Sequence, residues 1–60
     1  MYRVEIVEKT KKYGDITRIS SPAKTKKEQA RLINYFQNVY KEEIEKETHY
    51  IKIAFYNIRF

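Results

Sequence analysis

The sequence predicts a small α+β fold of order ββαβ, a three-stranded, mainly antiparallel sheet with one helix packed on one face. Three observations predict it: two β-branched stretches flank a glycine, a helical repeat of apolar residues follows, and the chain continues into a run rich in Ile and aromatics. The 60 residues include one glycine, one proline and no cysteine. This composition is typical of one folded domain, residues 1–60, without a disulfide or thiolate-metal site to support it.

The first strand is predicted at residues 2–9. There Tyr2, Val4 and Ile6 alternate with polar residues, and a period of two with β-branched side chains is typical of a strand. The second strand is predicted at residues 15–20.

Gly14 lies between the two strands and takes positive φ without steric cost, which predicts a hairpin with a loop of about four to five residues. In the second strand Ile16 and Ile19 do not share strand parity. This mismatch predicts a bulge or a strand end near Arg18.

A helix start is predicted at Thr25, because Thr25 and Glu28 have the spacing of a capping box. The alternative start is Pro22 as the first helical residue, with Ser21 as its cap. The Thr25 start is favoured, because a start at Ser21 places Lys24 in the first turn, where the helix dipole disfavours a cation.

The helix is predicted over residues 25–46 from two stripes of side chains at spacings of three and four. The apolar stripe consists of Leu32, Ile33, Phe36, Val39, Tyr40 and Ile44. The opposite, polar stripe consists of Lys27, Arg31, Asn34, Asn38, Lys41 and Glu45.

The last strand is predicted at residues 49–59. Ile51, Ile53 and Phe55 fall on one side, and many of the alternating residues are also apolar, which is typical of a central strand. If this strand lies beside the first strand, the sheet is antiparallel with the order 2-1-3. The alternative, pairing with the second strand, requires a right-handed parallel crossover. The order 2-1-3 is favoured because it puts the strongly apolar first strand at the centre.

The formal net charge of +5 is concentrated in one third of the chain. Residues 9–31 hold eight of the basic side chains and two of the acidic ones, a net charge of +6, whereas residues 32–60 are neutral overall. Such asymmetry indicates attraction to anions.

The first functional hypothesis is therefore a non-enzymatic protein that binds DNA or RNA. Lysine and arginine neutralise phosphates, and asparagine reaches the backbone or base edges. The candidate residues are Lys11, Lys12, Lys24, Lys27, Arg31, Asn34 and Asn38, with the hairpin tip expected near one end of the helix. The alternative is a solvated helix face that keeps a small domain soluble.

A second candidate surface is the sheet face away from the helix, beside Arg3, Glu5 and Val7. Its aromatic and basic residues form either a platform on which bases stack or the interface of a homodimer, and the dimer is favoured. The candidate residues are Tyr50, Lys52, Tyr56, Ile58 and Phe60. The alternative function is a protein-binding modulator, docking through this face or through the edge of the second strand.

Catalytic, metal and cofactor sites are not predicted. His49 is the one histidine and has no cysteine to accompany it, and no glycine-rich loop is present to hold a phosphate.

Cellular location and origin are predicted from composition. No apolar run approaches the roughly 18 residues of a membrane span, and the amino terminus lacks the apolar core of a signal peptide. We therefore expect a cytoplasmic protein without membrane contact. The Lys, Ile, Tyr and Asn content is typical of an AT-rich genome, such as that of a low-GC bacterium, a phage or a mobile element.

Overall fold

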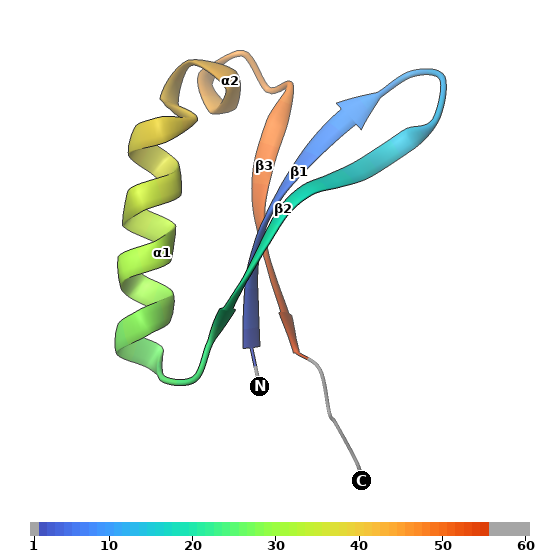
Figure 1. The fold of residues 1–60 in the computed structure, drawn as a ribbon. Coiled ribbons are helices and arrows are strands. Elements are labelled where there is room, and N and C mark those ends of the chain that lie inside the picture. The colour runs from blue at the N-terminus through green and yellow to red at the C-terminus, as the bar shows by residue number, and fades with distance from the viewer. Residues whose placement is uncertain (1, 56–60) are drawn as a thin grey trace, which may run out of the picture.

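The computed structural model describes residues 2–55 of the chain. The elements in chain order are β1 (Tyr2–Thr10), β2 (Gly14–Ala23), α1 (Lys26–Val39), α2 (Lys41–Glu45) and β3 (His49–Phe55). The strands form one antiparallel sheet of order β2-β1-β3, and α1 lies over one of its faces (Figure 1). The predicted α+β fold and its strand order are confirmed.

The hairpin between β1 and β2 is tighter than predicted, with a loop of residues 11–13. Gly14 follows the loop with φ of 72°, the left-handed conformation that closes three-residue hairpin loops. The Thr10 hydroxyl accepts a hydrogen bond from the Tyr13 N–H at 3.0 Å and donates one to the Gly14 carbonyl at 2.5 Å. These bonds fix the tip.

The predicted irregularity at Arg18 is a β-bulge. Ile6 faces Ile19, but Val7 faces Thr17, so Arg18 is the extra residue. Beyond the bulge β2 continues to Ala23 and does not end at residue 20. It passes through Pro22, which an edge strand tolerates because the outer side of such a strand needs no N–H.

The helix start predicted at Thr25 is also confirmed. The Thr25 hydroxyl accepts a hydrogen bond from the Glu28 N–H at 3.1 Å. The reciprocal bond differs by one residue from the predicted capping box, because the Glu28 carboxylate accepts from the Lys24 N–H at 2.8 Å. The cap therefore also ties down the segment that precedes α1.

The single helix predicted over residues 25–46 is in fact two helices. The helical backbone is interrupted at Tyr40, with φ of −106° and ψ of 25°. The Tyr40 ring lies 6.5 Å from the Phe36 ring and 5.9 Å from the His49 ring, between centroids. Packing on both rings fixes the interruption where the chain turns back towards β3.

The turn after α2 is closed by two hydrogen bonds of 3.0 Å. The Glu47 N–H donates to the Ile44 carbonyl, and the Thr48 N–H donates to the Glu43 carbonyl. This is the bonding pattern of a Schellman motif, in which the left-handed position is usually glycine. Here that position is Glu47, with φ of 60°.

The core lies between α1 and the sheet. Val4, Ile6, Ala23 and Phe36 are buried in it. The partly buried residues packed against them are Ile19, Leu32, Ile33, Tyr40 and Ile51. The predicted apolar stripe of the helix is thus largely in the core, except for Val39, which is exposed, and Ile44, which is half-buried but does not belong to the core cluster. The last strand is described as far as Phe55, so residues 56–59 of the predicted strand lie outside the described residues.

Candidate nucleic-acid interface

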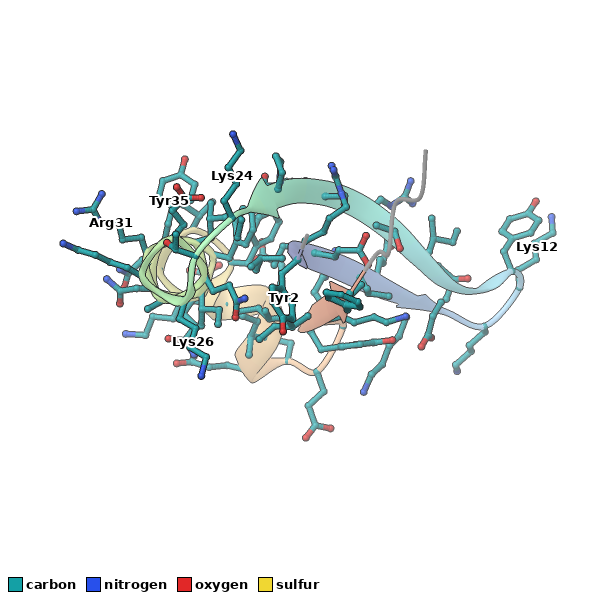
Figure 2. The ribbon with its side chains drawn as sticks, turned by 90° about the horizontal axis from the view of Figure 1, so that it is seen from below. Tyr2, Lys12, Lys24, Lys26, Arg31 and Tyr35 are labelled. Carbon is teal, nitrogen blue, oxygen red and sulfur yellow. The ribbon has the colours of Figure 1, made fainter. Side chains whose placement is uncertain are left out.

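The start of α1 presents four exposed cations. Three of them, Lys24, Lys27 and Arg31, are what we call the α1 cationic face, and Figure 2 shows the fourth, Lys26, on the opposite side of the helix from Lys24. The helical period of 3.6 residues puts Lys27 and Arg31 on the side of α1 opposite the buried Phe36. Asn34 continues the same stripe. Figure 2 shows Arg31 projecting from the helix on the side away from the sheet, and Lys24 projecting towards the upper side of the view beside the end of β2. The predicted polar stripe, with Asn38 one turn beyond Asn34, is exposed throughout.

The cations of the α1 cationic face have no acidic partner in residues 2–55. The one ion pair of this part of the chain joins Arg18 Nε to a carboxylate oxygen of Glu8 at 2.6 Å. The acid nearest in sequence to the face, Glu28, accepts its hydrogen bond from the Lys24 backbone. The positive charge of this surface is therefore not neutralised by the described side chains.

The acidic residues at the other end of the helical segment have a structural explanation. Glu42 and Glu43 lie in the first turn of α2, where the helix dipole favours negative charge. No group of acidic, histidine or cysteine residues that could hold a metal ion occurs in residues 2–55. His49 packs on Tyr40, and its Nδ1 lies 2.9 Å from the Thr48 hydroxyl.

The hairpin tip does not lie near the end of α1 that carries these cations, contrary to our expectation. Figure 1 shows the tip extending away from the sheet, while α1 begins on the opposite side of the molecule. Figure 2 likewise shows Lys12 and Arg31 at opposite ends of the view. At the tip, Lys12 Nζ lies 5.3 Å from the centroid of the Tyr13 ring. Lys11 and Lys12 thus form a surface separate from the α1 cationic face.

The open sheet face carries Tyr50 and Lys52 beside Arg3, Glu5 and Val7, as the strand alternation predicts. It is less exposed than expected, because Glu5 and Val7 are buried. The remaining candidates for this face, Tyr56, Ile58 and Phe60, lie outside the described residues.

A polar network covers part of the open face. The Ser20 hydroxyl accepts a hydrogen bond from Arg3 Nε at 2.6 Å and donates one to the Glu5 carboxylate at 2.8 Å. The Tyr50 hydroxyl donates to Asp15 at 2.8 Å. In the described part of the chain, therefore, this face is a hydrogen-bonded surface and not an apolar patch.

Two exposed features were missed by sequence reasoning. Tyr35 lies one turn after Arg31, exposed and on the same side of α1 (Figure 2). A shallow hollow of about 250 Å³ is lined by Pro22, Glu28, Arg31 and Leu32.

The second missed feature is on the helix side of β3, where Ile53 and Phe55 are exposed. Strand parity assigns them to the covered face, but the core includes Ile51 and neither of these two. Strand parity predicts on which face of the sheet a side chain lies. It does not predict how much of that face the helix covers.

Comparison of the chain with protein-family models, with curated proteins and with solved structures finds no match. In the described residues, no helix has the length and apolar character needed to cross a membrane.

Proposed function

We propose that this protein is a non-enzymatic nucleic-acid-binding protein that contacts phosphates through the α1 cationic face. One observation carries the proposal: three exposed cations at the start of a helix have no acidic partner in residues 2–55. Neutralising phosphates with such side chains releases condensed counterions, which is the main source of sequence-independent affinity.

The neighbouring polar residues fit the same ligand. Asn34 and Asn38 extend the surface along α1, and their amides can donate to phosphate oxygens or pair with base edges. Tyr35 adds an exposed ring beside Arg31, which suits stacking on a base or a sugar.

The competing interpretation, a helix face that serves only solubility, explains the position of the cations less well. Positive charge near a helix N-terminus opposes the dipole by about 0.3–1 kcal/mol per residue at low salt. The same chain follows the dipole rule at α2, where Glu42 and Glu43 occupy the first turn. Solubility is served equally by lysines placed elsewhere on the surface.

The test is a titration of labelled duplex and single-stranded oligonucleotides at several salt concentrations, using fluorescence anisotropy. The test variant is Lys24→Gln/Lys27→Gln/Arg31→Gln. The matched control is Lys9→Gln/Lys41→Gln/Lys46→Gln, which removes the same amount of positive charge from outside the α1 cationic face. Circular dichroism verifies that both variants remain folded.

We expect the test variant to lose close to three units of the salt slope on duplex, about 0.9 per phosphate contact, while the control keeps its slope. Equal losses in both variants would show that net charge and not this surface attracts the ligand. Absence of binding by the unmodified protein even at low salt would reject the proposed function, because phosphate-driven affinity is greatest there.

A further inference from the structure

The composition of β3 does not match its place in the sheet. Its helix-side face consists of Ile51, Ile53 and Phe55, yet the strand lies at the edge of the order β2-β1-β3. In residues 2–55 its only strand partner is β1. One side of β3 is therefore open.

The hydrogen-bond ladder identifies which groups face the open side. The Lys9 N–H donates to the Thr48 carbonyl at 2.8 Å, and the register from Glu8–His49 onwards runs without a bulge. Antiparallel ladders alternate between bonded and non-bonded pairs. The N–H and C=O groups of Ile51, Ile53 and Phe55 consequently point away from β1.

The other edge of the sheet is closed to a further strand. The same alternation turns Pro22 and the Ser20 carbonyl towards the outer side of β2. Pro22 has no N–H to donate, and the Ser20 carbonyl already accepts a hydrogen bond from the Arg3 guanidinium at 2.8 Å. The bulge at Arg18 further disrupts this edge. The edge of the second strand, our earlier candidate for docking, is thus the less suitable one.

Exposed apolar side chains lie along the β3 side of the sheet. Ile53 is 49% exposed, Phe55 61% and Tyr2 39%, and the ring centroids of Tyr2 and Phe55 are 5.0 Å apart. These residues lie on the helix side of the sheet, at the end that α1 does not cover. Open backbone groups and exposed apolar side chains together form an interaction surface.

We propose that β3 pairs in antiparallel orientation with β3 of a second copy of the chain, about a two-fold axis at Ile53. Ile53 then faces Ile53 of the second copy, and Ile51 faces Phe55. On the opposite face of the sheet, Lys52 lies across from Ala54. The result is a continuous antiparallel sheet of order β2-β1-β3-β3-β1-β2, in which the two β3 strands are central.

The register follows from the chemistry of the strand. The outward groups belong to alternate residues, so Ile51, Ile53 and Phe55 must bond to one another across the interface. An axis at Lys52 meets this condition but places two like charges opposite each other, which is destabilising. An axis at Ile51 leaves Phe55 without a partner in the facing strand.

A second copy is the occupant that fits this edge. The strand is complementary to itself in the stated register, as a two-fold interface requires, and Lys52 is the one Lys or Arg in β3. The excess positive charge of the chain lies in residues 9–31, away from the pairing strand. Because an interface built on one seven-residue strand lies at the small end of specific interfaces, we expect a dimer that dissociates on dilution.

The chain has no cysteine, so single cysteines can map the interface. The first experiment mixes Lys52→Cys chains with Ala54→Cys chains, one of them carrying a mass tag, under mild oxidation without nucleic acid. Facing residues of a non-bonded pair have Cα atoms about 4.5 Å apart, within disulfide range, whereas diagonal neighbours are about 7–8 Å apart. We expect the mixed disulfide to form at least about tenfold faster than either homodisulfide. Equal rates, or no cross-link, would overturn the proposed pairing.

The second experiment is sedimentation of the nuclease-treated protein over a range of concentrations. We expect the unmodified chain to approach twice the chain mass and Ile53→Lys to remain monomeric, because it opposes two charges at the axis. The matched control, Tyr35→Lys, makes the same type of change at an exposed residue of α1 and should still dimerise. A chain that is monomeric throughout would reject a second copy as the occupant and leave a different protein as the partner of this edge. Nucleic-acid binding is measured separately, so the two proposals fail independently.

Discussion

The Tyr50 hydroxyl of β3 donates a hydrogen bond to the Asp15 carboxylate of β2 at 2.8 Å, so it links the two outer strands across β1. The hydrogen bond, partial burial and the negative charge of Asp15 raise the pKa of Tyr50 above its ordinary value of 10.0. The folded protein therefore holds this proton more tightly than the unfolded chain.

The first prediction concerns alkaline stability. Since the folded pKa of Tyr50 is raised, its contribution is fully present below about pH 10 and is lost as the pH rises through the folded value. Above that pH, the free energy of unfolding should fall more steeply in the unmodified protein than in Tyr50→Phe. Urea denaturation at a series of pH values measures this. Tyr13→Phe, whose ring has no acidic partner in the described structure, should keep the full decline.

The second prediction concerns Gly14. Its φ of 72° strains any side chain, although a Cβ there would meet no heavy atom within 4 Å. Gly14→Ala should cost about 1–2 kcal/mol of unfolding free energy from backbone strain alone, as read by thermal denaturation. Gly14→Asn should cost less, because asparagine tolerates the left-handed region. Equal costs would mean that a feature other than φ governs this position.

The third prediction concerns Glu47, which holds the left-handed position after α2 with φ of 60°. Glu47→Gly should stabilise the fold by about 1 kcal/mol, because glycine removes the strain of that conformation. The control, Glu45→Gly, lies within α2 and should lose about 1 kcal/mol. Both variants lose one negative charge. A difference between their unfolding free energies, measured by chemical denaturation, therefore reports the local backbone effect.

The fourth prediction separates helix capping from ligand binding. Thr25→Ala removes the acceptor of the Glu28 N–H and should cost about 1 kcal/mol of stability. The salt slope of oligonucleotide binding should remain unchanged, because no charge is lost. Thr25→Ser retains the hydroxyl and should behave as the unmodified protein in both measurements. A change in slope for Thr25→Ala would mean that the cap positions the cations as well.

Much of the fold could be predicted because it is recorded in local patterns. Alternation along residues 2–9 indicates a strand, the pair Thr25 and Glu28 marks the helix start, and the parity mismatch of Ile16 and Ile19 predicts the bulge. Each of these patterns involves residues close together in the sequence, so local backbone geometry is sufficient to predict the structure that it forms.

The features that could not be predicted depend on tertiary placement. The interruption at Tyr40 coincides with packing of the Tyr40 ring on the ring of His49, which lies beyond α2 in the sequence. The exposure of Ile53 and Phe55 depends on how far α1 extends over β3, and the separation of Lys12 from the α1 cationic face depends on the direction of the hairpin. Charge composition predicted that cations would be concentrated, but not that they would divide between two surfaces.

Pro22 has a consequence for the size of any assembly. A sheet with two receptive edges can grow without limit, one chain after another, as in fibrils. In this chain the proline removes a donor from the outer side of β2, while β3 keeps its outward donors. Once two β3 strands have paired, both ends of the enlarged sheet are β2 strands that resist further addition. In the proposed dimer, Pro22 would therefore stop the sheet from growing beyond two copies.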